Sequence, residues 1–237
     1  MDWAAWAPTM AQVRADFGYD EADDRAAAEE LRPHLPTLSW RELGVLVRNR
    51  HAVVAGCGPS LLRAPRDLWK NPVVACDGAT EFLREQGVVP DVVVTDLDGQ
   101  PECLAWAART GSRMVVHAHG DNRDRLREVA PRLGPLLFGT CQVPPWDGMA
   151  PLRSVPGFTD GDRAVLLLEA LGARSALLVG FDFDQPPSRY SHRWDPATKP
   201  RKLAWAGRIV ADCVARGKLP VRRYVPAPDT TDRAQRA

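Results

Sequence analysis

Short apolar runs alternate with helix-like segments from His51 onward, and this alternation constrains the fold more than any other feature of the sequence. The apolar runs are HAVVAG (51–56), PVVACDG (72–78), DVVVTDLDG (91–99), RMVVHAHG (113–120), PLLFGT (135–140) and ALLVGFDFD (176–184). Between them, segments such as PECLAWAARTG (101–111) and GDRAVLLLEALGA (161–173) have helical periodicity and glycine stops. Repeated strand-then-helix order predicts an open, mostly parallel sheet with helices on both faces.

The chain of 237 residues divides into three predicted regions. Residues 1–47 are rich in Ala, Glu and Arg, are interrupted by Pro33 and Pro36, and predict a small helical appendage whose aromatic residues pack onto the main body. Residues 48–220 predict a Rossmann-like α/β domain, and 45% hydrophobic residues suffice for its core. Residues 221–237 predict a tail with too little apolar content to pack at its end.

Charge and cysteine usage exclude several classes of protein. A net charge of +1 gives no electrostatic case for a nucleic-acid or membrane surface. The five cysteines are widely spaced and lack a CxxC pair, so the sequence predicts neither a disulfide framework nor a zinc knuckle. There is no basic start followed by an apolar run and no apolar stretch of ~18 residues. We therefore expect a soluble, cytoplasmic protein.

The run PDVVVTDLDG (90–99) ends in two carboxylates, Asp96 and Asp98. In an extended chain residues two apart face the same side, about 6.5 Å apart along the strand. Solvent or a divalent cation with oxygen ligands, such as Mg²⁺, can offset the repulsion of such a pair. The alternative is a strand that simply runs out into a polar Asx turn.

Polar residues follow four of the six apolar runs. Acidic residues beside glycine recur there: Asp77, Asp96, Asp98, Asp182 and Asp184. In open α/β sheets ligands bind outside the carboxyl ends of the strands. The recurrence therefore predicts a site for a cation and phosphate at this edge.

The first run is followed by a glycine-rich turn, Gly56-Cys57-Gly58-Pro59-Ser60. Backbone amides at such a helix start attract phosphate oxygens. The turn is not a Walker A loop, and Leu61 occupies the third glycine position of G-x-G-x-x-G. A plain tight turn is the alternative.

The segment VVHAHGDN (115–122) resembles the start of an H-x-H-x-D metal motif, with His117, His119 and Asp121. Asn122 stands where such motifs continue with another histidine, which argues against a zinc site. Alternatively, Asp121 or Asn122 caps the next helix and the histidines line the crevice.

Two later segments predict substrate contacts. In GFTDGDRAV (157–165), Phe158 suits the face of a flat heterocycle and Asp160 its amino-substituted edge, whereas Asp162 suits a helix cap. The segment RYSHRWDPATKPRKLAW (189–205) carries Lys199 and Lys202 and predicts either a basic flap over phosphates or a solvated loop.

Six motifs in order, GCGPSL, CDGAT, PDVVVTDLDG, HAHGDN, GFTDGDRAV and VGFDFD, resemble the archaeal-type 6-hydroxymethyl-7,8-dihydropterin pyrophosphokinases. That family is related in fold to thiamine pyrophosphokinases, and the resemblance covers about residues 3 to 220. It implies transfer of the terminal pyrophosphoryl group of ATP to the pterin hydroxymethyl oxygen, with AMP as product and Mg²⁺ required. It also implies a place in tetrahydromethanopterin or folate biosynthesis. Thr95 and Gly99 depart from the GDxDS-like motif of thiamine pyrophosphokinases, which bears on the identity of the acceptor.

The residues and the resemblance together give a set of expected roles. The metal-binding candidates are Asp77, Asp96 and Asp98. Lys199 and Lys202 are expected to balance charge in the transition state. The nucleotide-binding candidates are Gly56, Gly58, Pro59, Ser60, His119, Asp121 and Asn122. The substrate-binding candidates are Phe158, Thr159, Asp160 and Asp182.

Three alternatives to a pterin diphosphokinase are a thiamine pyrophosphokinase, a glycosyltransferase-like protein and a non-catalytic nucleotide-binding domain. The expected partners are ATP and a pterin, with neither nucleic acid nor a membrane. The sequence leaves the oligomeric state open, a homodimer included.

Overall fold

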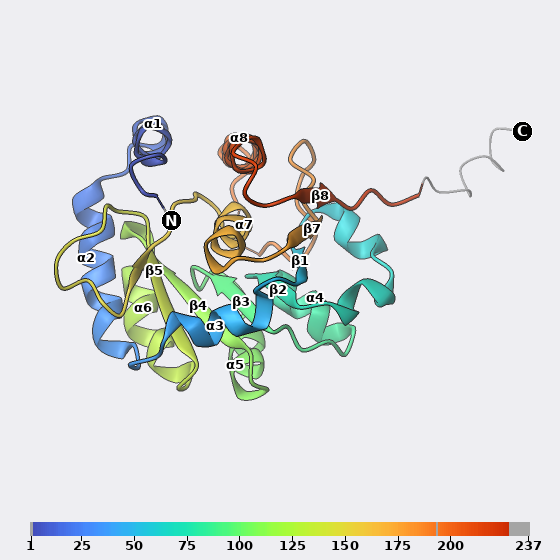
Figure 1. Ribbon diagram of the computed structural model, residues 1–237, viewed down its shortest axis with the longest axis horizontal. Helices are drawn as coiled ribbons and strands as arrows, with labels where there is room; N and C mark the ends of the chain where they lie inside the picture. Colours follow the sequence, from blue (N-terminus) through green and yellow to red (C-terminus); the bar gives the residue numbers. More distant parts are fainter. Residues whose placement is uncertain (1, 193, 228–237) are drawn as a thin grey trace, which may run out of the picture.

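One open sheet of parallel strands organises the molecule (Figure 1), and the computed structural model describes residues 2–192 and 194–227. Within these residues the strand order is β6-β5-β4-β3-β2-β1-β7-β8, and every neighbouring pair is parallel. The strands are β1 (His51–Ala55), β2 (Val73–Cys76), β3 (Val92–Thr95), β4 (Arg113–Ala118), β5 (Leu137–Cys141), β6 (Arg153–Ser154), β7 (Ser175–Val179) and β8 (Val221–Arg223). Each of the six predicted apolar runs overlaps one strand, and the predicted fold class is confirmed.

Helices cover both faces of the sheet, as expected (Figure 1). The helices α2 (Glu21–Leu31), α4 (Ala79–Glu85), α5 (Pro101–Arg109) and α6 (Arg123–Val129) contribute to the apolar core on one face. The core on the other face includes side chains of α3 (Trp40–Val47), α7 (Asp160–Leu171) and α8 (Lys199–Ala215). Short 3-10 helices are η1 (Arg32–His34), η2 (Pro59–Arg63), η3 (Arg66–Lys70), η4 (Gly120–Asn122) and η5 (Ala130–Arg132).

The N-terminal helical region packs on both faces of the sheet. Helix α1 (Ala7–Phe17) ends at Gly18, whose φ of 68° allows a left-handed cap, and α2 follows. After the break at Pro33 and Pro36, a capping box between Ser39 and Glu42 starts α3. Leu31 of α2 lies in one core, and Trp40 of α3 lies in the other.

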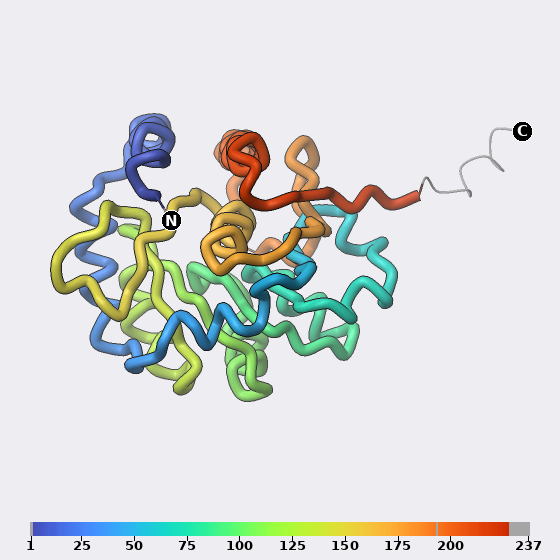
Figure 2. The backbone as a smooth tube through the Cα atoms, viewed as in Figure 1, coloured from blue at the N-terminus to red at the C-terminus, as the bar shows by residue number. Residues whose placement is uncertain are grey.

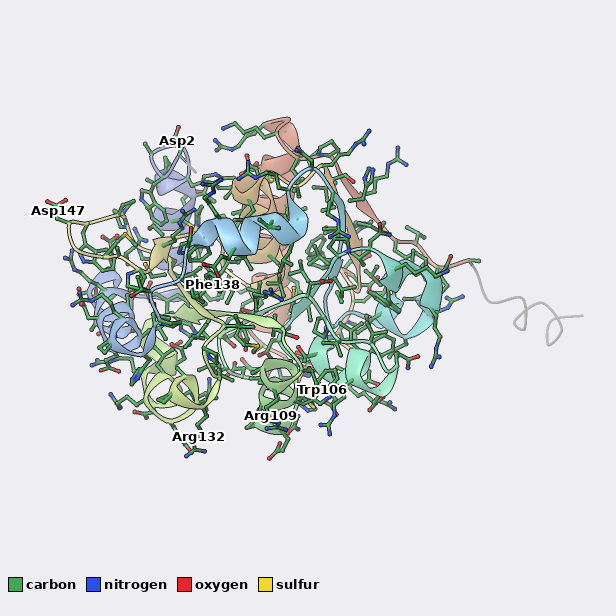
Figure 3. The ribbon with its side chains drawn as sticks, turned by 60° about the horizontal axis from the view of Figure 1, so that its bottom comes forward. Asp2, Trp106, Arg109, Arg132, Phe138 and Asp147 are labelled. Carbon is green, nitrogen blue, oxygen red and sulfur yellow. The ribbon has the colours of Figure 1, made fainter. Side chains whose placement is uncertain are left out.

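Segments far apart in the sequence meet where α1 and α8 lie on the same side of the molecule (Figure 2). The Trp205 indole nitrogen of α8 donates to Asp16 Oδ2 of α1 at 2.8 Å, and Arg216 donates to the Ala5 carbonyl at 2.9 Å. Figure 3 contrasts Arg132 and Asp147, at the periphery, with Phe138, which is buried and packs against Trp40 with ring centroids 5.3 Å apart.

Two short edge strands were not predicted. Strand β6 has two residues and β8 has three, so neither forms an apolar run. Strand β8 begins at Val221, in the segment predicted as a tail, and pairs with β7. The end of that predicted tail, residues 228–237, lies outside the described residues, and the domain boundaries stay a prediction.

The direction in which the chain adds strands to the sheet reverses beside β1, which makes this position a topological switch point. Strands β2 to β6 extend the sheet on one side of β1, and α7 then leads back to β7 on its other side. Connections therefore diverge at the carboxyl ends of β1 and β7, which is where open α/β sheets bind ligands. No helix in the described ranges has the length and apolar character needed to cross a bilayer.

Candidate active site

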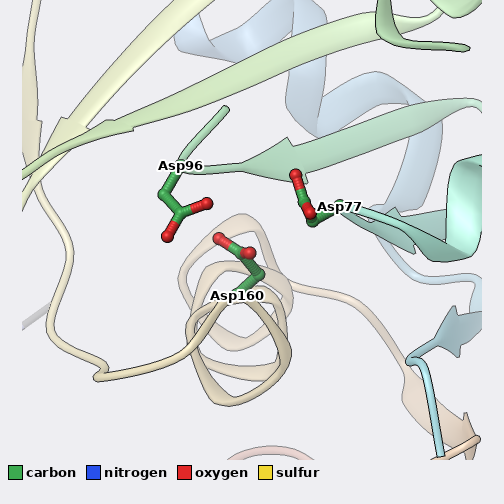
Figure 4. Close-up of side chains that lie close together, drawn as sticks. All are labelled: Asp77, Asp96 and Asp160. Atoms are coloured by element: carbon green, nitrogen blue, oxygen red, sulfur yellow. The ribbon is translucent and has the colours of Figure 1, made fainter. Parts of the chain in front are cut away.

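Three carboxylates converge at the carboxyl edge of the sheet. Asp77 follows β2, Asp96 follows β3, and Asp160 is the first residue of α7. One oxygen of each lies within 4.8 Å of the others, and Figure 4 shows the carboxylates of Asp96 and Asp160 turned toward each other with Asp77 alongside. Among the described residues this is the sole group of His, Cys, Asp or Glu side chains placed to hold a metal ion.

Backbone turns of unusual geometry hold the first two carboxylates. Asp77 has a φ of 44° and Leu97 a φ of 71°, in the left-handed region that non-glycine residues rarely adopt. Asp77 Oδ1 accepts hydrogen bonds from Thr95 Oγ1 at 2.5 Å and from the Gly99 amide at 2.9 Å. The loops after β2 and β3 are thereby tied together, which fixes the spacing of Asp77 and Asp96.

The position of Asp98 differs from the one expected if the chain continued as an extended strand. Strand β3 ends at Thr95, and the left-handed Leu97 turns the chain, so Asp96 and Asp98 do not share a strand face. Asp96 Oδ1 accepts from the Asp98 amide at 3.1 Å, which is the Asx turn considered as the alternative. The Asp98 carboxylate forms an ion pair with Arg125 of α6. Asp160 therefore occupies the third position of the cluster, and a metal-binding role for Asp98 stays a prediction.

The pKa values of two of the three carboxylates are raised, and that of the third is lowered. Burial, followed by the charge of Asp96, raises the pKa of Asp77 to about 7. Burial and the charges of Asp96 and Asp77 raise the pKa of Asp160 well above its ordinary value. Burial also acts to raise the pKa of Asp96, but the hydrogen bond and charge of His119, the Asp98 amide and the charge of Arg125 together outweigh it, so that pKa is lowered. Such a group of oxygens suits a hard divalent cation, which would remove the repulsion.

The HAHGDN segment supports this cluster. His119 Nδ1 accepts from the Asp121 amide at 3.3 Å, so Nε2 carries the proton and faces Asp96 Oδ2 at 3.5 Å. Asn122 is buried, and its side-chain amide nitrogen donates to the carbonyls of Asp96 and His117 at 2.9 and 2.7 Å. His119 thus borders the cluster, Asn122 joins the ends of β3 and β4, and Asp121 is exposed beside them.

Backbone amides of the glycine-rich turn after β1 already have hydrogen-bond acceptors within the protein. The amides of Gly56 and Gly58 donate to the carbonyls of Val179 and Gly180, both at 2.8 Å. Asp182 Oδ2 accepts from the Ser60 amide at 2.9 Å and from Ser60 Oγ at 2.7 Å, which caps η2. The turn borders the active-site cavity, but these three amides have intramolecular acceptors, so its predicted contact with phosphate stays a prediction.

A cavity of about 410 Å³ joins these groups. The predicted residues at its surface are Gly56, Gly58, Asp77, Asp96, Asp98, His119, Phe158, Thr159, Asp160, Asp182, Lys199 and Lys202. Pro59, Ser60, Asp121 and Asn122 are not at its surface. The Lys202 ammonium lies 5.7 Å from the centre of the Phe158 ring, and Lys199 Nζ lies 3.4 Å from Ser191 Oγ.

The cavity-lining residues that sequence reasoning missed include Tyr19, Gln142 and Arg163. Gln142 follows the fifth apolar run and could have been found by extending the rule of polar residues at strand ends. Arg163 lies inside a helix whose apolar residues suggested a purely structural role, and Tyr19 lies in the predicted appendage. Asp162, predicted as a cap, does cap α7: its carboxylate accepts from the amides of Phe158 and Thr159 at 2.7 and 2.6 Å.

Comparisons with known proteins agree with one another. A family model described as 6-hydroxymethylpterin diphosphokinase, MptE-like, matches residues 30–187. A Pyrococcus furiosus protein named 6-hydroxymethyl-7,8-dihydropterin pyrophosphokinase is 40% identical over 222 residues, covering 89% of this chain and 93% of that protein. Proteins of the same name from Methanothermobacter thermautotrophicus and Methanocaldococcus jannaschii are 36% and 35% identical. Those alignments cover 94% and 81% of this chain, and 100% and 84% of the relatives.

Proposed function

The chain belongs to the MptE-like family of 6-hydroxymethylpterin diphosphokinases, and from this membership we propose that it transfers a pyrophosphoryl group from ATP to 6-hydroxymethyl-7,8-dihydropterin. The hydroxymethyl oxygen forms a bond to the β-phosphorus of ATP, the bond from that phosphorus to the α,β-bridging oxygen breaks, and AMP leaves. The hydroxyl proton is released. The observation that carries the proposal is the convergence of Asp77, Asp96 and Asp160 at one cavity.

The three carboxylates fit a magnesium ion. Their oxygens are hard ligands and lie within 4.8 Å of one another, and burial together with the charge of the neighbouring carboxylates raises the pKa of Asp77 and of Asp160. We assign Asp77, Asp96 and Asp160 as the residues that would hold Mg²⁺. When bound, Mg²⁺ supplies positive charge to the oxygens of the polyphosphate.

The residues around the cluster orient it and balance charge. His119 donates to Asp96 and keeps that carboxylate ionised, whereas Thr95 and Gly99 fix the orientation of Asp77. Lys199 and Lys202, from the first turn of α8, add positive charge at the cavity. Transfer of a phosphoryl-type group depends mainly on such charge and on alignment, because the protein has little covalent chemistry to perform.

We further propose a cytoplasmic setting and a role in tetrahydromethanopterin or folate biosynthesis. The five cysteines are free thiols, which supports a reducing compartment. The acceptor named for the relatives supports a pterin pathway.

A direct assay of AMP release tests the proposal. The full chain is incubated with ATP, Mg²⁺ and 6-hydroxymethyl-7,8-dihydropterin, and the products are identified by mass spectrometry. We expect AMP and the pterin diphosphate in equal amounts, and no AMP after chelation of Mg²⁺. AMP release with thiamine instead would identify a thiamine pyrophosphokinase. ATP binding without AMP release with either acceptor would identify a nucleotide-binding protein without this activity.

A further inference from the structure

The cavity has two ends, and the carboxylate cluster lies between them. In the sheet order β5-β4-β3-β2-β1-β7, Asp77 and Asp96 follow the middle strands β2 and β3. The turns after β1 and β7 form one end of the cavity, whereas His117 of β4 and Gln142 after β5 border the other. A group passing between two bound molecules must lie between them, so the two ends correspond to two substrate subsites.

The end beside β1 and β7 suits the nucleotide. It lies at the switch point of the sheet. Lys199, at the start of α8, borders the same cavity as Gly56 and Gly58 of the turn after β1. An ammonium group near the turn after β1 matches a polyphosphate.

The end beside β4 and β5 contains buried polar groups with unused hydrogen-bonding capacity. His117 is 3% exposed and Arg163 is 1% exposed, and both border the cavity. Among the described residues, neither His117 Nε2 nor Arg163 Nε has a partner in good hydrogen-bond geometry, although the Gln142 side chain lies close enough to His117 to act on its pKa. The two terminal guanidinium nitrogens of Arg163 are held by the carbonyls of Val155 and Gly157 and by Gln142 Oε1, at 2.8, 2.9 and 3.2 Å. Buried polar atoms normally have partners, so two unpaired atoms at one end of a cavity indicate a bound polar ligand.

The tautomer of His117 determines whether its Nε2 atom donates or accepts a hydrogen bond. Thr140 Oγ1 lies 3.3 Å from the Val116 carbonyl and 3.2 Å from His117 Nδ1, and when its hydroxyl donates to that carbonyl it accepts from a protonated Nδ1. Burial and the nearby charge of Arg163 lower the pKa of His117 well below its usual value, so the imidazole is neutral. In the tautomer with the proton on Nδ1, His117 Nε2 is a hydrogen-bond acceptor, and Arg163, which borders the same cavity, offers Nε as a donor.

We propose that the heterocyclic ring of the hydroxymethyl acceptor occupies the β4–β5 end, where His117 Nε2 accepts from a ring N–H and Arg163 Nε donates to the adjacent ring carbonyl. This assignment rests on the function proposed above. A pterin carries such an N–H beside a carbonyl at positions 3 and 4 of its ring. Tyr19 and Phe158 border the same cavity with ring centroids 6.2 Å apart and supply apolar surface for a flat ring.

Kinetics with a modified acceptor test the assignment on the full chain. The acceptors are 6-hydroxymethyl-7,8-dihydropterin and its N3-methyl derivative, which lacks the ring N–H. The variants are His117→Leu, which removes the acceptor atom, and His117→Gln, which restores a polar group near the position of Nε2. We expect His117→Leu to raise KM for the pterin about tenfold, with KM for ATP changed less than about twofold. The wild type should disfavour the methylated acceptor about tenfold or more, His117→Leu should lose that preference, and His117→Gln should recover part of it.

Thr140→Val provides a second variant if His117→Leu does not fold. It keeps the shape of the side chain but removes the hydroxyl group that contacts His117 Nδ1, so the imidazole proton is no longer held on that atom. KM for the pterin should therefore rise about threefold while kcat changes little. The assignment is overturned if His117→Leu or Thr140→Val raises KM for ATP instead, or if discrimination against the methylated acceptor is unchanged. A wild type that releases no AMP contradicts the proposed function; calorimetric binding of the pterin to wild type and His117→Leu then still tests the subsite.

Discussion

Asp160 and Asp162 stand two residues apart at the start of α7 and perform different tasks. Asp162 is fully buried, and its two oxygens accept from the amides of Phe158 and Thr159 and from Thr159 Oγ1. Asp160 faces the carboxylates of Asp77 and Asp96, and burial together with their charges raises its pKa. Asp162 therefore stabilises the start of the helix, whereas Asp160 contributes a carboxylate that its neighbours repel.

Replacing each of these two residues by asparagine separates stability from activity. Asp160→Asn removes a repelled carboxylate, so the free energy of unfolding without Mg²⁺ should stay within about 1 kcal/mol of wild type or rise. Turnover should fall at least about 100-fold. Asp162→Asn should cost about 0.5–2 kcal/mol because the cap loses an acceptor oxygen. Urea unfolding and AMP release measure both; a large loss of stability in Asp160→Asn would contradict the proposed division of tasks.

The pKa of Asp77 predicts how pH acts on the metal-free protein. This carboxyl group titrates at about 7 in the folded state, against an ordinary value of 3.8. Between those values the folded state binds more protons than the unfolded state, so its contribution to stability is present at low pH and is lost as the pH rises through about 7. Mg²⁺ requires the ionised form, so its stabilising effect should grow over the same window.

Unfolding measured between about pH 5 and 8, with a chelator and with Mg²⁺, tests this prediction. The two stability curves should diverge as the pH rises. Asp77→Asn serves as the control because it removes the titrating group, and its curves should stay close together. Parallel curves in the wild type would show that Asp77 does not couple proton and cation binding.

At the scale of elements, the turns after β1 and β7 are packed directly on each other. Gly58 donates to the Gly180 carbonyl, and Asp182 reaches back to cap η2. A Cβ atom at Gly58 would lie 2.7 Å from the Gly180 oxygen and would also meet Asp182 Oδ2. Glycine is required here by the close approach of two loops, which positions the switch point of the sheet.

Two glycine substitutions test this packing. Gly58→Ala should destabilise the protein by about 2 kcal/mol or more, because backbone atoms must move to admit the methyl group. Gly44→Ala is the matched control: Gly44 lies within α3, and its added Cβ would find no atom closer than 3.8 Å. That variant should gain about 0.5–1 kcal/mol from helix propensity. Thermal unfolding of both proteins gives the comparison, and equal effects would show that the loop contact is not tight.

The strands were predictable where the sequence contains a clear apolar run. Each β-branched or apolar run became a strand because a sheet buried on both faces requires such residues. The edge strands β6 and β8 carry no such run, since pairing with a neighbour alone defines them. Asp77 and Asp96 could be predicted as partners because parallel strands end at one edge. The sequence did not indicate that Asp160, rather than Asp98, completes the cluster. The position of Asp160 depends on where α7 begins relative to β2 and β3, and the position of Asp98 depends on the left-handed turn at Leu97.

At the scale of the whole molecule, the N-terminal helices are part of both cores. Helix α2 places Ala27, Ala28 and Leu31 against one face of the sheet, and α3 places Leu43 and Val47 against the other. Tyr19, between α1 and α2, also borders the cavity. The region predicted as an appendage therefore contributes to the stability of the sheet and to the active site at once.

A chain that begins at residue 48 should consequently fail to fold cooperatively. Leu31, Leu43 and Val47 are fully buried, and each contributes about 1.5–3 kcal/mol. Their loss alone approaches the roughly 5–15 kcal/mol that separates folded from unfolded states of a typical domain. The shortened chain should show a broad unfolding transition and bind hydrophobic dyes, whereas Leu43→Ala in the full chain should lose about 2–5 kcal/mol and still unfold cooperatively. A sharp transition with retained AMP release in the shortened chain would show that residues 48 onward fold independently and that Tyr19 is dispensable for the reaction.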